Sequence, residues 1–180
     1  DFIAQMVPAF DDIAANLCAQ MAKSDSCEFQ SAFATPFAGQ AITTLLGLER
    51  SQWPMIAQNA SDLGLAMGVN SKAHEPVFDA AYLRLRDLAE ELVGQARAGQ
   101  NQNGFVARMV ALFDKQPDVS YAALYDLIVI AIFGGVDTTR SQLGLGMALM
   151  IEHPNQWQAL RRDESLVAPA VEEFIRTRPT

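Results

Sequence analysis

Apolar residues recur along most of the chain at the three- and four-residue spacing of an α-helix, with little of the alternation typical of strands. Pro36 suits the first turn of one helix and Gly47 its C-terminal cap. The fold class is therefore predicted to be all-α, and we expect residues 1–180 to form a single helical domain. The pattern predicts helices over residues 1–23, 36–46, 51–69, 71–99, 105–115 and 120–152, with shorter helices after them.

The helix predicted over residues 120–152 is the most informative element of the chain. It would be roughly 50 Å long at about 1.5 Å per residue, so it must cross the whole molecule. Gly134 and Gly135 stand together in its middle, although each glycine costs a helix about 1 kcal/mol relative to alanine. Asp137 and Thr138 add polar groups to the same apolar stretch. A specific requirement must keep these residues there.

One face of this helix loses bulk towards its centre, and two interpretations of that face remain open. A flat ligand could lie against it, or another helix could cross it closely, because small residues allow either approach. The residues of the face, at helical spacing, are Leu127, Ala131, Gly134, Thr138 and Ser141.

The charge and the apolar runs narrow the possible partners and the location. The formal net charge is -8 and no basic run is present, which argues against a nucleic-acid partner. The longest apolar stretch, residues 122–136, contains Tyr125 and Asp126 and is shorter than the roughly 20 residues of a membrane span, so no membrane partner is expected. We expect a cytoplasmic protein. The chain opens in mid-pattern without a starting Met, which predicts a piece of a longer protein.

The residues that most often bind metals are few and scattered. Cys18 and Cys27 do not make a disulfide framework, and a reducing compartment is the simpler reading. His74 and His153 have no second ligand at a metal-binding spacing. No metal site made by these residues is predicted.

Three motifs follow one another in the second half of the chain. They are GGVDTT at residues 134–139, HPNQW at residues 153–157, and an ExxR pair made by Glu173 and Arg176. In this order they resemble the distal half of a cytochrome P-450, a haem-thiolate monooxygenase of the bacterial soluble type. GGVDTT matches at every position the family's small-Gly-x-Asp/Glu-Thr-Thr/Ser signature in the central helix. The resemblance implies a partial P-450 fold, from about the D helix to the K helix, around one long central helix.

The resemblance also implies roles for residues of the long helix. Asp137 and Thr138 would be catalytic: Thr138 would steady the oxygen bound to haem iron, and Asp137 would link that point to solvent for proton delivery. Ala131, Gly134 and Gly135 would lie on the distal haem face. We also expect the Thr138 hydroxyl to engage the carbonyl four residues earlier.

Further residues receive a structural or a substrate-binding role. The pair Glu173 and Arg176 would anchor the segment that leads to the haem-ligand loop. Candidates for the substrate pocket lie on two neighbouring helices, although core packing explains them equally well. These candidates are Met55, Met67, Phe78 and Tyr82.

The family's iron ligand is a cysteine in a Phe-x-x-Gly-x-x-x-Cys-x-Gly loop, which these 180 residues do not contain. We therefore expect haem in the intact parent, which would hydroxylate a small apolar substrate with electrons from a ferredoxin-type partner. The 180 residues alone are expected to bind no haem through Cys and to be inactive. The alternative is a non-catalytic helical protein derived from that fold, which buries the small-residue face in a homo-oligomer, most simply a dimer.

Overall fold

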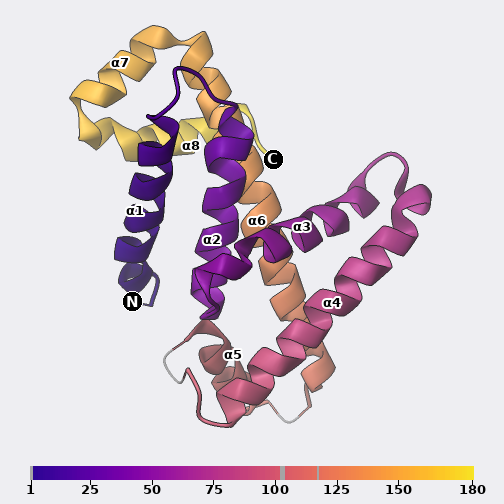
Figure 1. Ribbon diagram of the computed structural model, residues 1–180. Helices are drawn as coiled ribbons and strands as arrows, with labels where there is room; N and C mark the ends of the chain where they lie inside the picture. Colours follow the sequence, from indigo (N-terminus) through magenta and orange to yellow (C-terminus); the bar gives the residue numbers. More distant parts are fainter. Residues whose placement is uncertain (1, 102–103, 117) are drawn as a thin grey trace.

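The computed structural model describes residues 2–101, 104–116 and 118–180, and within these ranges the chain is helical and contains no strand (Figure 1). The all-α prediction is confirmed. Short π or 3-10 turns stand at Gln30–Ala34, Arg50–Gln52, Leu65–Met67 and Glu164–Leu166. The α-helices are α1 (Phe2–Met21), α2 (Thr35–Leu46), α3 (Trp53–Gly64), α4 (Ser71–Arg97), α5 (Phe105–Phe113), α6 (Tyr121–Glu152), α7 (Pro154–Arg162) and α8 (Val167–Thr177).

The ends of α2 follow the local chemistry that the sequence indicates. Pro36 lies in the first turn, and Gly47 caps the helix in the left-handed region, at φ 78°. The segment before α2, which lies outside the helices predicted from the sequence, contains a π-helix over Gln30–Ala34. The amide of Thr35 donates to the carbonyl of Gln30, five residues earlier. The next residue, Pro36, has no amide proton and cannot donate a hydrogen bond to this turn.

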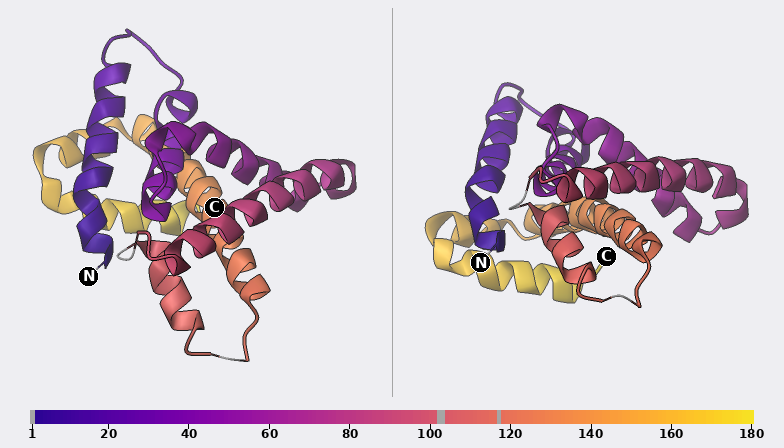
Figure 2. Two further views of the ribbon diagram at one scale, coloured as in Figure 1. Left: turned by 60° about the horizontal axis from the view of Figure 1, so that its bottom comes forward. Right: turned by 90° about the horizontal axis from the view of Figure 1, so that it is seen from below.

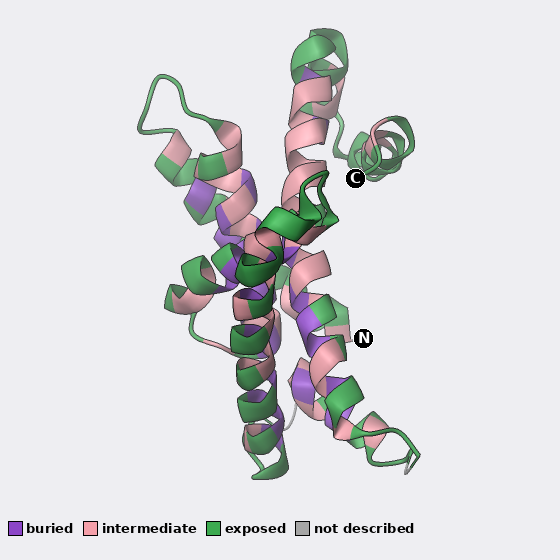
Figure 3. Cartoon of the chain, turned by 90° about the vertical axis from the view of Figure 1, so that its right-hand side faces the viewer, coloured by how far each residue is buried: buried purple, intermediate pink, exposed green. Residues whose placement is uncertain are grey.

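The long helix α6 passes through the centre of the molecule (Figures 1 and 2). It packs against α2, α3 and α4 along its first two thirds, and against α7 and α8 near its C-terminal end. Ile128, Ile132 and Val136 are fully buried and lie on one side of the helix, four residues apart. They form the centre of the hydrophobic core, and Figure 3 shows buried residues along the inner sides of the central helices.

At two helix crossings a glycine leaves room for a side chain of the neighbouring helix. A Cβ built on Gly39 of α2 would lie 2.9 Å from the ring of Trp53 at the start of α3. A Cβ on Gly135 of α6 would lie 2.8 Å from the end of the Ile42 side chain of α2. These contacts set how closely α2 approaches its two neighbours.

By length and composition alone, α6 is apolar enough to cross a membrane. The expectation of no spanning segment rested on one interrupted apolar run, and the helix as a whole meets the criterion. The central helix of a water-soluble helical protein meets the same criterion, and α6 packs against six other α-helices.

The contact between Gly39 and Trp53 predicts that an alanine substitution lowers the stability of the protein at Gly39 but raises it at Gly94. Gly39→Ala should lower the free energy of unfolding by about 1–3 kcal/mol, because the added methyl group meets the Trp53 ring and lies 3.4 Å from the Trp53 carbonyl oxygen. Gly94→Ala in α4 is the control: nothing lies within 4 Å of its Cβ position, so stability should rise by about 0.5–1 kcal/mol. Urea denaturation measures both, and equal effects would contradict this description of the crossing.

Candidate functional site

The middle of α6 has an apolar face that the rest of the described chain leaves open. Leu127 is 42% exposed and Ile130 is 63% exposed, although both belong to the molecule's central helix, in its first third. Gly134 and Thr138 continue the same face at helical spacing, and Thr138 is exposed. We call these four residues, Leu127, Ile130, Gly134 and Thr138, the open face of α6.

The face predicted from the sequence differs slightly from this set. Ile130 was not predicted, although it lies four residues before Gly134 and could have been found from that spacing. Ala131 and Ser141, which were predicted to belong to the face, are partly buried. The small-residue strip is thus narrower than expected and has large apolar side chains at one end.

The two adjacent glycines of α6 have different surroundings. Gly135 faces Ile42 of α2, so its missing side chain is explained by helix packing. Gly144 and Gly146 likewise face other elements, through Gln30 and Phe174. Nothing lies within 4 Å of the Cβ position of Gly134. Among the four glycines of α6, only Gly134 has no neighbouring element in the described structure that explains the absence of a side chain.

Thr138 lies one turn beyond Gly134 on the open face. Its hydroxyl donates a hydrogen bond of 2.6 Å to the carbonyl of Gly134, as the sequence analysis expected. The hydroxyl proton therefore points along the helix. The lone pairs of Oγ1 remain available as acceptors for a group that lies against the face.

Asp137 adjoins Thr138 in sequence, but its carboxylate lies towards α3. Its Oδ1 accepts a 2.6 Å hydrogen bond from Nη2 of Arg140, and the two side chains are 29% and 24% exposed. Nη1 of Arg140 donates in turn to Oγ of Ser61 in α3, also at 2.6 Å. The sequence analysis did not single out Arg140 or Ser61. The i,i+3 spacing could have indicated Arg140, whereas only the folded structure brings Ser61 close.

Glu173 and Arg176 form the bidentate ion pair that their spacing in α8 permits, with distances of 2.6 and 2.7 Å. The hydrogen bond from Arg176 lowers the pKa of Glu173 below its ordinary value. Both side chains are more than half exposed, so the pair contributes little to stability in this structure.

The four candidate substrate-pocket residues are divided between two environments. Met55 and Met67 are exposed, at 41% and 78%. Phe78 and Tyr82 stack on each other in α4 and pack against the core. The Tyr82 hydroxyl donates to Asp126 of α6 at 2.6 Å, and this hydrogen bond raises the pKa of Tyr82. The Tyr82 hydroxyl thus fastens α4 to α6.

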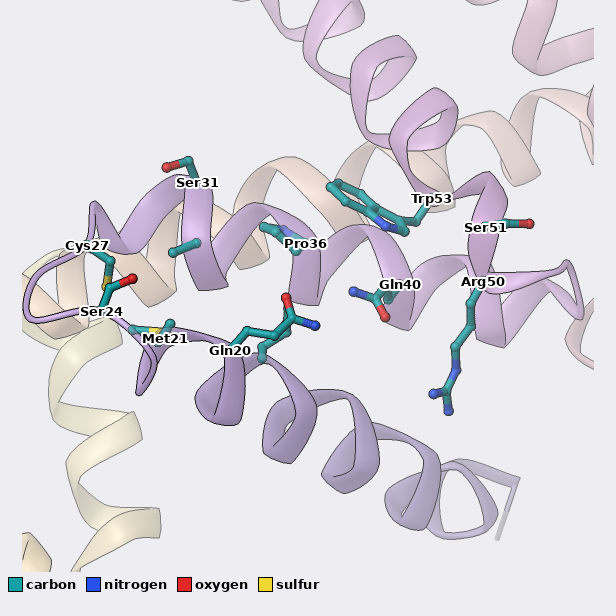
Figure 4. Close-up of a pocket in the computed structure, with 12 residues that line it drawn as sticks. Gln20, Met21, Ser24, Cys27, Ser31, Pro36, Gln40, Arg50, Ser51 and Trp53 are labelled. Carbon is teal, nitrogen blue, oxygen red and sulfur yellow. The ribbon is translucent and has the colours of Figure 1, made fainter.

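Two hollows border these helices. The first, about 530 Å³, lies between α1, α2 and the start of α3, and Cys27, Gln40 and Trp53 are among its lining residues (Figure 4). The second, about 550 Å³, begins at Thr138 and Thr139 and runs between α6 and α8. We call the second hollow the α6–α8 groove.

Known proteins resemble this chain over almost its whole length. No family model matches it. A polyketide biosynthesis cytochrome P-450, PksS of Bacillus subtilis, is 23% identical over 93% of this chain and 40% of its own length. Cytochrome P-450 105C1 of a Streptomyces species is 31% identical over 80% of this chain and 35% of its own length. The crystal structure of CalO2 superposes with a TM-score of 0.82 and 26% identity, over 96% of this chain and 43% of that one. The chain belongs to the cytochrome P-450 family.

The match covers only part of each relative. The chain spans about two fifths of the length of the curated P-450 relatives it matches, so it corresponds to a portion of the P-450 fold. The prediction of a partial, all-helical P-450 fold around one long helix is confirmed.

A P-450 holds haem iron, and the open face of α6 fits one side of such a group. The empty Cβ position of Gly134 leaves room for a flat macrocycle, and Leu127 and Ile130 offer it an apolar surface. The two cysteines, which could in principle supply a thiolate ligand, lie in other surroundings. Cys18 and Cys27 are both free and exposed, and Cys27 lines the hollow between α1 and α2, to which α6 contributes no residue (Figure 4).

Proposed function

We propose that residues 1–180 form the distal, oxygen-activating side of the haem pocket of a P-450 monooxygenase. One observation carries this proposal: Gly134 has no packing partner, and the Thr138 hydroxyl lies one turn away on the same open face. When bound, haem supplies the oxygen binding and electron transfer that protein side chains cannot perform. Ala131, Gly134 and Gly135 belong to the helix segment that would hold the haem on its distal side, where Gly134 would leave room for it and Gly135 lets Ile42 of α2 pack behind the helix.

The protein's part of the chemistry is to deliver protons while excluding bulk water. Leu127 and Ile130 cover the apolar end of the face, so water reaches the reacting centre by a restricted route. Asp137 is 29% exposed and therefore exchanges protons with solvent. Thr138 Oγ1 accepts a hydrogen bond on the open face and passes the proton on through its own hydroxyl, which leaves the Gly134 carbonyl when it turns towards the face.

The substrate and the electron donor are inferred at the level of chemical class. The exposed side chains on the open face are apolar except for the Thr138 hydroxyl, which favours a small apolar substrate held next to that hydroxyl. Met55 and Met67 are exposed and flexible enough to adapt to such a substrate. As the electron donor of the intact protein we propose a ferredoxin-type protein.

Substitution of Gly134 tests the proposal. In the intact protein that carries these residues, Gly134→Leu should weaken hemin binding at least about tenfold, because the new side chain occupies the space of the macrocycle. Gly94→Leu places the same side chain in an equally open position on α4 and should leave hemin affinity unchanged. Titration of the apoprotein with hemin, followed by Soret absorbance, measures both. Hemin affinity equal to wild type in Gly134→Leu would refute the proposed haem seat.

A second candidate function is self-association without catalysis. It is favoured by the apolar α6–α8 groove, where Val171 and Ile175 are 45% and 48% exposed, together with the open face of α6. Such surfaces are rarely left in contact with water.

Two measurements on the 180-residue chain alone test whether it self-associates and whether it can bind haem through a thiolate. Light scattering should give the mass of a dimer or larger oligomer, because the apolar surfaces of two copies cover each other. The same sample with hemin, dithionite and carbon monoxide should give no thiolate-type Soret band, because neither Cys18 nor Cys27 stands in the family's Phe-x-x-Gly-x-x-x-Cys-x-Gly ligand loop. A monomer would contradict self-association. A thiolate-type band would contradict the proposed inactivity of these residues alone.

A further inference from the structure

Arg140 joins the acid of the candidate site to a neighbouring helix. One guanidinium makes two hydrogen bonds of 2.6 Å, from Nη2 to Asp137 and from Nη1 to Ser61 of α3. Each bond uses a different nitrogen of the planar group. Because the guanidinium is rigid, the bond to Ser61 sets the orientation of the group and therefore the plane in which Nη2 binds Asp137.

The backbone of Arg140 is held from a second side. Its carbonyl accepts a hydrogen bond of 3.2 Å from Nε2 of Gln30, in the π-helix that precedes α2. The side-chain and main-chain contacts of Arg140 therefore come from two elements that are far apart in sequence. The side chain is 24% exposed, so these hydrogen bonds are partly shielded from competing water.

The contacts leave the carboxylate of Asp137 in a defined orientation. Arg140 engages Oδ1, which also lies 3.6 Å from the Cβ position of Gly64 at the end of α3. In the described structure Oδ2 has no hydrogen bond to the protein and is the oxygen available to water. Without Arg140, the carboxylate would be free to take other rotamers, because a partly exposed aspartate without a fixed partner has several of similar energy.

We propose that Arg140 is a positioning residue that holds Asp137 in its proton-transferring rotamer, with Ser61 fixing Arg140 to α3. The orientation of the acid thereby depends on the position of α3, the helix that also carries the candidate pocket residue Met55. The effect of this arrangement on catalysis rests on the proposed function, whereas the orientation of Asp137 by Arg140 does not depend on it.

The test compares four variants of the intact protein. Arg140→Gln and Ser61→Ala remove the two ends of the connection, and Arg140→Lys keeps the charge without the planar group. Arg84→Gln is the matched control, because Arg84 connects Asn59 and Asp62 of the same helix α3 to α4 without reaching Asp137. The first measurement is the side-chain rotamer of Asp137, from crystal structures or from NMR scalar couplings. It requires neither haem nor turnover.

We expect one Asp137 rotamer in wild type and in Arg84→Gln, and two or more in Arg140→Gln, Arg140→Lys and Ser61→Ala. We also expect kcat to fall about ten- to a hundredfold in Arg140→Gln, while the Kd of the substrate changes less than about twofold. Ser61→Ala removes only a hydroxyl, so it keeps the test available if an Arg140 variant does not fold.

A single Asp137 rotamer in both Ser61→Ala and Arg140→Gln would overturn the inference, whatever the activity. Several rotamers with unchanged kcat would support positioning by Arg140 and count against the proposed proton-delivering role of Asp137. Failure of the inference and failure of the proposed function are thus separate results.

Discussion

The close contact between α2 and α6 determines which side of the central helix is left open. Ile42 packs where a side chain on Gly135 would be, and Ile132 and Val136 are buried on the same inner side of α6. With that side fixed against the core, the 100° rotation between successive residues directs Gly134 and Thr138 outward. The open face is therefore a consequence of core packing and does not depend on any interaction of its own.

The same rotation separates the two polar residues of the site. Thr138 lies on the open face, bonded to the carbonyl of Gly134, whereas Asp137 lies towards α3 and is bound by Arg140. The proposed function needs this separation, because in it Asp137 exchanges protons with water while Thr138 faces an apolar pocket. Two adjacent positions on one helix supply both environments.

Much of the fold could be predicted from the sequence because the relevant signals are local. Helical periodicity, Pro36 and Gly47 predict the positions of the helices, and the unbroken pattern around Gly134 predicts the length of α6. The π-helix before Pro36 was not predicted, because helical periodicity does not distinguish it from an ordinary turn. The different surroundings of Gly134 and Gly135, and the approach of Ser61 to Arg140, depend on tertiary contacts with α2 and α3 that one sequence does not reveal.

The open face of α6 is the proposed seat of a haem. The decisive experiment is a crystal structure of the intact protein with haem bound. If the face is that seat, the macrocycle should lie in van der Waals contact with Gly134, about 4 Å from its Cα, with the Thr138 hydroxyl facing the iron. A macrocycle bound elsewhere, or a segment of protein covering Gly134 in its place, would rule this seat out.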